Sequence, residues 1–307
     1  MKIGLIDVDG HNFPNLAIIK LSAWHKSKGD SVEWWNGLKT YDLVYKSKVF
    51  DKTYSEDIKH CINADQIVEG GTGYDLKNKL QDEIEHIYPD YSLYQVDSDD
   101  QDYDPFEVKN TAYGFLTRGC PRNCPFCIVS KKEGSRSKQV ADLSEFWKEQ
   151  RYIKLLDPNL LACRSHEKLL RQLVDSGAYV DFTQGLDIRL TTKDNIALLN
   201  KIRTKRLHFA WDNPDEDLTE SFKIFDRHAR IKDPSKRIVY VLTNFGSTHE
   251  QDLYRIYTLR DLGYNPYIMI FDKPHAPQRT RLLQRWCNNR IIFCAEPDFS
   301  KYDPSMG

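Results

Sequence analysis

Short apolar runs recur at a nearly even interval from residue 113 onward. After the first run the spacing is about 27 to 32 residues, which is the length of one strand–helix unit. Regular alternation of strands and helices predicts an α/β protein with a parallel sheet, curling into a partial (β/α)6, TIM-like barrel with its active residues at the carboxyl ends of the strands. The six predicted strands are 113–116, 152–156, 179–183, 206–210, 238–243 and 266–271.

Helical segments with recognisable ends fill the gaps between these strands. Ser165 is placed to cap a helix whose leucines share one face, and Gly177 stands where a left-handed C-terminal residue is wanted. Thr248 and Gln251 have the spacing of a capping box, and Gly263 follows the helix that they begin. Strand and helix are therefore expected to alternate throughout this part of the chain.

Residues 1–95 predict a separate and smaller α/β domain. A helix is predicted over 14–28, with Pro14 near its first turn. The strands and this helix together indicate a doubly wound, Rossmann-like sheet. The four predicted strands are 3–7, 32–35, 43–45 and 66–68.

An acidic segment separates the two predicted domains. Residues 96–108 contain many aspartates and few apolar side chains, which is typical of a linker and not of a core. The barrel is then expected over 109–275. A C-terminal helix and an extra strand closing the open side of the barrel are expected within 276–307.

Composition limits the classes of partner. The chain has 307 residues, 40% hydrophobic and 29% charged, with a net charge of −1, so it has a full core but no overall positive charge to hold it on nucleic acid or an anionic membrane. No apolar run approaches the length of a bilayer span, and the first one meets Asp7 too early for a secretory signal. The seven cysteines show no paired framework. We therefore expect a cytoplasmic protein in a reducing compartment.

Three cysteines carry the most specific chemical signal. Cys120, Cys124 and Cys127 have the spacing C-x3-C-x2-C, which closes three thiolates around one small loop and is typical of an iron–sulfur site. A cubane cluster has four irons, so three protein ligands leave one iron open for chemistry. Zinc is the structural alternative, but it needs four ligands, and the nearest further candidates, Cys163 and His166, lie at a predicted helix start.

With Phe126 directly before the third cysteine, this motif resembles that of the radical S-adenosylmethionine (SAM) enzymes. The resemblance implies one [4Fe–4S] cluster, with the amino and carboxylate groups of SAM bound to the open iron. It also implies reductive cleavage of the sulfonium C–S bond, giving a 5′-deoxyadenosyl radical that abstracts hydrogen from a substrate. The family fold is typically built from six strand–helix units. A flavodoxin- or ferredoxin-type protein is the expected electron donor, whereas the motif identifies neither the substrate nor a catalytic hydrogen donor.

Two other functions stay open. Asp9-x-His11 and the later Gly70-Gly71 resemble the cobalamin-binding motif in which a histidine ligates cobalt, although Pro14 replaces a glycine of that motif. A cobalamin-dependent radical SAM methyltransferase is therefore one alternative, with a repurposed cobalamin-like domain favoured over bound cobalamin. The alternative that is not an enzyme is a redox-sensing iron–sulfur protein that never cleaves SAM.

The ends of the predicted strands suggest contacts to SAM. Asp157 and Asn159 follow the second strand, where the family usually has a glycine-rich segment with a glutamate that receives the amino group of SAM. A helix-capping turn is an equal alternative for this pair. Gln184 and Arg189 follow the third strand, and the planar guanidinium of Arg189 suits the methionine carboxylate or, alternatively, a structural ion pair with Asp187.

The next strand ends offer contacts of the same kind. Trp211 ends the fourth strand and would stack on the adenine, while Asn244 ends the fifth and would bond the ribose or the adenine edge. Asp272 stands in the same position after the sixth strand. Ordinary turn chemistry is the alternative for each of these residues.

A basic patch surrounds the cysteines despite the near-neutral total charge. Such a patch would dock an acidic reductant or attract a phosphate-bearing substrate, and a solvated basic surface is the alternative. Its members are Arg118, Arg122, Lys131, Lys132, Arg136 and Lys138.

Overall fold

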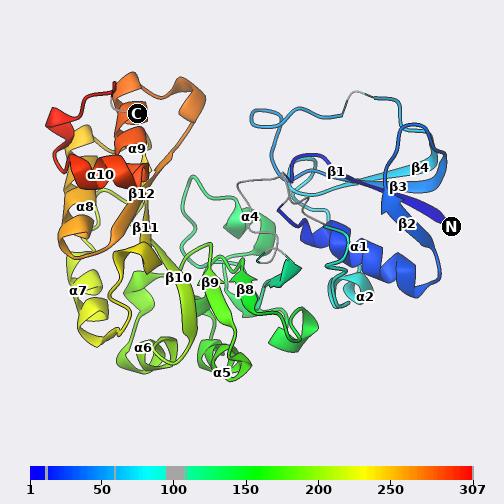
Figure 1. The fold of residues 1–307 in the computed structure, drawn as a ribbon, viewed down its shortest axis with the longest axis horizontal. Helices are drawn as coiled ribbons and strands as arrows, with labels where there is room; N and C mark the ends of the chain where they lie inside the picture. Colours follow the sequence, from blue (N-terminus) through cyan, green and yellow to red (C-terminus); the bar gives the residue numbers. More distant parts are fainter. Residues whose placement is uncertain (11–12, 59, 95–106, 108, 306–307) are drawn as a thin grey trace. The chain divides into compact units, whose positions relative to one another are not determined.

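The computed structural model describes residues 1–10, 13–58, 60–94, 107 and 109–305. Within these residues it contains a four-stranded parallel sheet and a six-stranded parallel sheet, which confirms the predicted α/β class (Figure 1). The chain divides into two compact units, residues 1–154 and 155–307. The predicted acidic linker, residues 96–108, lies outside the described residues except for Glu107.

The four-stranded sheet lies in the first unit and has the order β2-β1-β3-β4. Strand β1 is central, with Ile3 paired to Val32 on one side and to Leu43 on the other. The order therefore reverses at β1, where β2 lies on one side and the later strands lie on the other. The strands are β1 (Lys2–Asp7), β2 (Ser31–Trp34), β3 (Tyr41–Ser47) and β4 (Ala64–Gly70), each overlapping a predicted strand.

Alternation along β1 gives this sheet two buried faces. Ile3 and Leu5 pack with Ile18 of helix α1 (Leu16–Ser27), whereas Ile6 packs with Val44 on the opposite face. This is the period of two expected of a strand that is covered on both sides. The oxygen of the Asn15 carboxamide accepts bonds from the Ala17 and Ile18 amides, so Asn15 caps α1 and the helix begins at Leu16, two residues later than predicted.

The six-stranded sheet has the order β12-β11-β10-β9-β8-β5, so successive strands of the chain are neighbours. The register is regular between β11 and β12, where Tyr240 pairs with Tyr267, and shifts between β9 and β10 after Thr204. Its strands are β5 (Thr111–Gly114), β8 (Tyr152–Leu155), β9 (Tyr179–Phe182), β10 (Arg203–Ala210), β11 (Arg237–Thr243) and β12 (Asn265–Ile270).

Helices lie along one side of strands β9 to β12 in the second unit (Figure 1). They cover the face that carries Phe209, Val239 and Ile268, all of which are fully buried. The helices of this unit are α5 (His166–Ser176), α6 (Lys193–Leu199), α7 (Thr219–His228), α8 (His249–Asp261), α9 (Gln278–Asn288) and α10 (Arg290–Ala295). No helix in the described ranges has the length and hydropathy needed to cross a bilayer.

Most of the predicted helix ends are confirmed. Gly177 has a left-handed φ of 63° after α5, and Gly263 has a φ of 75° after α8. Thr248 and Gln251 form the reciprocal capping box, with backbone–side-chain bonds of 3.2 and 2.9 Å. Ser165 occupies the N-cap of α5 but makes no side-chain cap bond, since its φ and ψ of −93° and 16° are not those of an extended N-cap.

The closing strand expected after residue 276 does not form within residues 276–305. This stretch contains α9, α10 and a single 3-10 turn at Phe299–Lys301. Side chains of α9 take the place of a strand at the edge of β12: Asn288 accepts a bond from the Ile268 amide at 2.7 Å, and Gln284 donates to the Ile268 carbonyl at 3.0 Å. The apolar residues of the tail pack instead around the buried Trp286.

Candidate functional site

The cysteine loop, residues 119–128, is held at its base by a short antiparallel pair, β6 (Thr117–Arg118) and β7 (Lys138–Gln139). The Cys120 amide donates to the Gly134 carbonyl at 3.1 Å, and the Cys127 amide donates to the Cys124 carbonyl at 3.0 Å. Helix α4 (Val129–Glu133) follows directly. The loop therefore has a defined backbone with hydrogen bonds at its entrance and within its second half.

Gly119 sets the entrance to the loop. Its φ is +87°, and a Cβ added there would lie 2.2 Å from the Arg136 carbonyl oxygen. Its amide donates to the Glu133 carboxylate at 3.0 Å, and the same carboxylate pairs with Arg118 at 3.0 Å. Only glycine fits this close approach of two backbone segments.

None of the three cysteines is in a disulfide, and each has intermediate exposure. Among the described residues, no three His, Cys, Asp or Glu side chains are gathered as the ligands of a metal ion would be. Three cysteine sulfurs on one short, partly accessible loop are nevertheless of the donor type that an iron–sulfur cluster uses. Phe126, which directly precedes Cys127 in the sequence, is half-buried.

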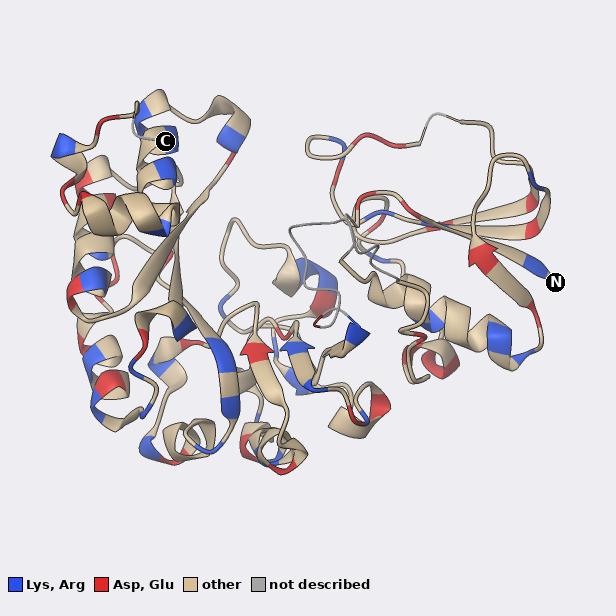
Figure 2. Ribbon diagram, in the orientation of Figure 1, with Lys and Arg blue, Asp and Glu red and all other residues tan. Residues whose placement is uncertain are grey.

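The basic patch around the loop divides into two kinds of residue. Arg118 forms ion pairs with Glu133 at 3.0 Å and with Glu85 at 3.5 Å. Lys132 donates to the Thr72 hydroxyl, and burial lowers the pKa of Lys132. The short helix α4 carries both signs of charge (Figure 2). The four members that remain exposed are Arg122, Lys131, Arg136 and Lys138.

In the second unit, the predicted SAM contacts Asn159 and Arg189 belong to one polar network. The Asn159 carboxamide accepts a bond from the Ala162 amide at 3.3 Å and donates to Asp187 at 3.4 Å. Arg189 pairs with Asp187 at 2.6 Å and with Glu216 at 2.6 Å, and these carboxylates raise its pKa against the opposing effect of burial. Asp157 is also buried, at 4% exposed. The capping turn and the structural ion pair that the sequence offered as alternatives are thus both present.

The other predicted contacts lie in three different environments. Gln184 is exposed on the turn after β9. Trp211 is 1% exposed, donates from its indole to the Glu216 carbonyl at 2.6 Å and packs in the core. Asn244 has a left-handed φ of 62° and donates to the Phe271 carbonyl at 2.8 Å, which joins the ends of β11 and β12. Their roles toward SAM stay predictions.

Arg255 of α8 fixes the carboxyl ends of β10 and β11. Its guanidinium is fully buried and donates to the carbonyls of Trp211 at 2.7 Å, Asp212 at 3.1 Å and Leu242 at 3.0 Å. The carboxylate of Asp252 accepts a further bond at 2.5 Å. Asp212 beside it is desolvated, and burial raises its pKa to about 6.

The sequence analysis missed a polar cluster inside the second unit. Asp181, His208 and Tyr240 come from three neighbouring strands, with the His208 Nδ1 3.5 Å from Asp181 and 3.1 Å from the Phe182 carbonyl oxygen. The His208 and Tyr240 rings are stacked with centroids 5.2 Å apart. Burial lowers the pKa of His208 to about 4, so the imidazole is neutral at pH 7. A polar residue in the middle of each apolar strand was the available signal.

The amino-terminal sheet has its own polar group where the strand order reverses. Asn15, the cap of α1, donates to Ser47 at 2.9 Å and to Asp7 at 3.3 Å, joining the carboxyl ends of β3 and β1. Tyr94 also donates to Asp7, and burial raises the pKa of this carboxyl group. Ligands of doubly wound sheets bind at such a reversal. His11 of the predicted cobalamin motif lies outside the described residues.

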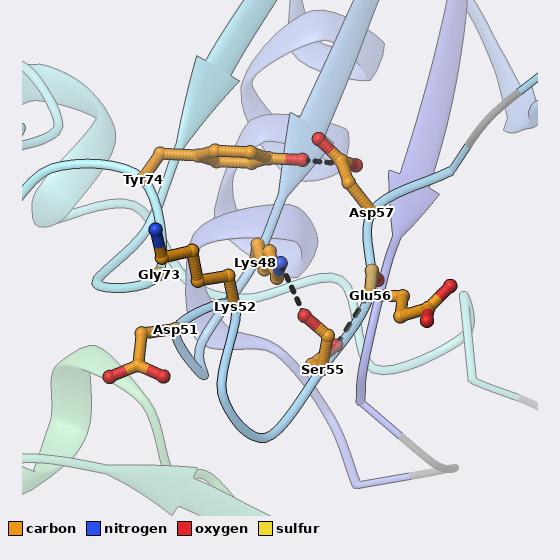
Figure 3. Close-up of a pocket in the computed structure, with 8 residues that line it drawn as sticks. All are labelled: Lys48, Asp51, Lys52, Ser55, Glu56, Asp57, Gly73 and Tyr74. Carbon is orange, nitrogen blue, oxygen red and sulfur yellow. Dashed lines mark hydrogen bonds between the residues drawn. The ribbon is translucent and has the colours of Figure 1, made fainter.

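A cavity of about 640 Å³ lies next to the carboxyl ends of β3 and β4 (Figure 3). Lys48 is 3% exposed and donates to the Ser55 carbonyl at 2.7 Å, while Tyr74 donates to Asp57 at 2.7 Å. Gly71 and Gly73 allow the close approach of the two walls, because a Cβ on Gly71 would lie 2.3 Å from the Lys48 carbonyl. The cavity is lined by Lys48, Asp51, Lys52, Ser55, Glu56, Asp57, Gly73 and Tyr74.

No protein-family model matches the chain, and no curated protein matches its sequence.

Proposed function

We propose that the chain is a radical SAM enzyme whose cluster is held by Cys120, Cys124 and Cys127. The observation that carries the proposal is the cysteine loop itself, in which three cysteines outside any disulfide stand on one short loop with a hydrogen-bonded backbone. Three ligands leave one iron of a cubane open, as a SAM-binding cluster requires. The chemistry that such a cluster supplies when bound is one-electron cleavage of the sulfonium C–S bond, which gives methionine and a 5′-deoxyadenosyl radical.

The residues around the thiols have roles that follow from their contacts. Gly119 and Glu133 hold the backbone on the amino-terminal side of Cys120, since the Gly119 amide donates to the Glu133 carboxylate at 3.0 Å. Asn123 adopts a φ of 48° between the first two cysteines and accepts a bond from Ser130 at 2.8 Å. A loop fixed in this way presents its thiols with little loss of backbone entropy on binding. The partial barrel belongs to the same proposal, with the six parallel strands as its wall.

The test begins with anaerobic reconstitution of the full chain with iron and sulfide. We expect about four irons per chain from the cubane stoichiometry, and 5′-deoxyadenosine after dithionite and SAM are added. Cys124→Ser should lose both the cluster and the product. Cys294→Ser is the matched control, because Cys294 is an exposed free thiol elsewhere in the chain and should leave both unchanged.

Three results would reject the proposal or redirect it. Bound zinc with no iron would identify a structural metal site. A cluster that is unaffected by Cys124→Ser would have other ligands. An intact cluster that binds SAM without forming 5′-deoxyadenosine would favour a redox-sensing iron–sulfur protein.

A further inference from the structure

The C-terminal helices of the second unit carry an unbalanced positive charge. Residues 273–295 contain five Lys or Arg residues and no Asp or Glu, although the whole chain has a net charge of −1. Helices α9 and α10 lie within this stretch (Figure 2). A local surplus of this kind creates a positive potential that extends roughly one Debye length, about 8 Å at physiological salt.

Three of these cations surround a shallow cavity of about 630 Å³ beside β12. They are Lys273, Arg285 and Arg290, and no carboxylate lines the cavity with them. Within the described part of the chain, none of the three forms an ion pair. Asp272, the residue before Lys273, contacts His275 at 2.9 Å, and the carboxylate of Asp233 interacts electrostatically with Arg290 without an ion-pair contact. The cavity is therefore lined by positive charge without a direct ion pair.

Exposed apolar side chains lie along β12 and directly after its end. Tyr267 lines the cavity and is 40% exposed, and Met269 and Phe271 follow at alternate positions with 47% and 40% exposure. Alternate residues of a strand point to the same face. Phe245 contacts Phe271 edge to face, with ring centroids 4.8 Å apart, which holds the Phe271 ring in place. Flat, accessible rings thus stand next to unpaired cations.

One alternative ligand, a peptide that would add as a strand to the edge of β12, does not fit this surface. Asn288 bonds both the amide and the carbonyl of Ile268, at 2.7 and 3.1 Å, and Gln284 bonds the same carbonyl at 3.0 Å. A peptide strand adding to this edge would need these backbone groups. The surface therefore offers charge and stacking but not strand pairing at its centre.

We propose that Lys273, Arg285 and Arg290, together with Tyr267 and Phe271, bind single-stranded nucleic acid. Cations that follow the phosphate backbone, beside aromatic rings on which bases stack, are the two features such surfaces combine. The near-neutral whole chain has no general attraction for a polyanion, so binding of one requires a local positive surface such as this. The inference does not depend on the cluster, because Cys120, Cys124 and Cys127 lie in the first unit and all five residues lie in the second.

The test is fluorescence anisotropy of the full chain with a labelled single-stranded 12-mer RNA or DNA. Three phosphate contacts predict a slope of log K against log salt of about −2 for a single strand. Arg285→Gln with Arg290→Gln should weaken binding about tenfold or more and bring the slope to about −0.7. Tyr267→Ala should weaken binding about tenfold without changing the slope, because stacking is not an ionic contact.

The matched control removes two exposed arginines elsewhere in the second unit, Arg171→Gln with Arg227→Gln, and should change binding less than about twofold. The same affinity is expected from the Cys124→Ser chain, so failure of the cluster proposal leaves this result intact. Absence of binding at 50 mM salt, or equal weakening by the control pair, would overturn the inference. Full displacement by 1 mM inorganic phosphate would instead identify a simple anion site.

Discussion

Replacing Arg255 by methionine tests how the carboxyl ends of β10 and β11 are held in place. The guanidinium is 1% exposed and donates to three backbone carbonyls, those of Trp211, Asp212 and Leu242, at 2.7 to 3.1 Å. It also balances the buried carboxylate of Asp252. Methionine keeps much of the side-chain length but supplies none of these bonds.

The expected cost follows from the groups left behind. Removing one partner of a buried ion pair destabilises a protein by about 3 to 5 kcal/mol, because the other charge stays buried without compensation. The three carbonyls that lose a donor add to this unless water reaches them, at roughly 1 to 3 kcal/mol each when they stay dry. We therefore expect Arg255→Met to lower the free energy of unfolding of the second unit by at least about 3 kcal/mol.

Urea unfolding, followed by tryptophan fluorescence, measures this loss, since Trp211 and Trp286 are both buried in the second unit. Adding Asp252→Leu to Arg255→Met should recover about 1 to 2 kcal/mol, because it removes the uncompensated charge but not the unpaired carbonyls. The control is Arg171→Met, whose side chain is 63% exposed and should cost within about 0.5 kcal/mol. A loss below about 1 kcal/mol for Arg255→Met would refute the reasoning.

Two further predictions concern pH and the cysteine loop. Burial raises the pKa of Asp212 to about 6 and lowers that of His208 to about 4, so as pH rises from 4 to 6 the Asp212 contribution to stability falls while the His208 contribution rises. The Asp212→Asn variant lacks the Asp212 contribution that falls with pH. Its free energy of unfolding should therefore increase between pH 4 and 6.5, by roughly 3 kcal/mol at most. A pH profile identical to that of the wild type would contradict this. Gly119→Ala places a Cβ 2.2 Å from the Arg136 carbonyl oxygen and should destabilise the chain by about 2 to 4 kcal/mol and block cluster assembly. Gly177→Ala, with a positive φ but open space around the Cβ, should cost only about 1 kcal/mol, and equal losses in chemical denaturation would exclude the steric explanation.

The strands could be predicted because their signal is local. Apolar runs such as Ile238 to Thr243 mark buried parallel strands without reference to any partner, and the structure places β11 at Arg237–Thr243. The capping box of Thr248 and Gln251 is equally local, since both bonds form within one turn. The closing strand was wrong for the opposite reason. Whether a strand can add to the edge of β12 depends on whether Asn288 reaches Ile268, a contact between residues 20 positions apart in the chain.

The candidate site could be predicted only in part. The spacing of Cys120, Cys124 and Cys127 is a property of one short segment, so it can be read directly. The cluster of Asp181, His208 and Tyr240 joins three strands, and only the register of the sheet decides that these three side chains meet. The sequence of each strand does not show its register with the neighbouring strands. A shift of one residue would move each side chain to the other face of the sheet and separate these three.

Arg189 illustrates how a correctly chosen residue acquires its partners from the fold. The sequence suggested either a ligand carboxylate or Asp187, and the structure gives Arg189 two carboxylates, Asp187 and Glu216, both at 2.6 Å. These two partners are not equivalent: the Asp187 side chain is 3% exposed, whereas that of Glu216 is 35% exposed. Separating Arg189 from Asp187 would leave a buried charge uncompensated, while Glu216 can turn into solvent at little cost. An anionic ligand of Arg189 would therefore replace Glu216 and leave Asp187 in place as the residue that orients the guanidinium.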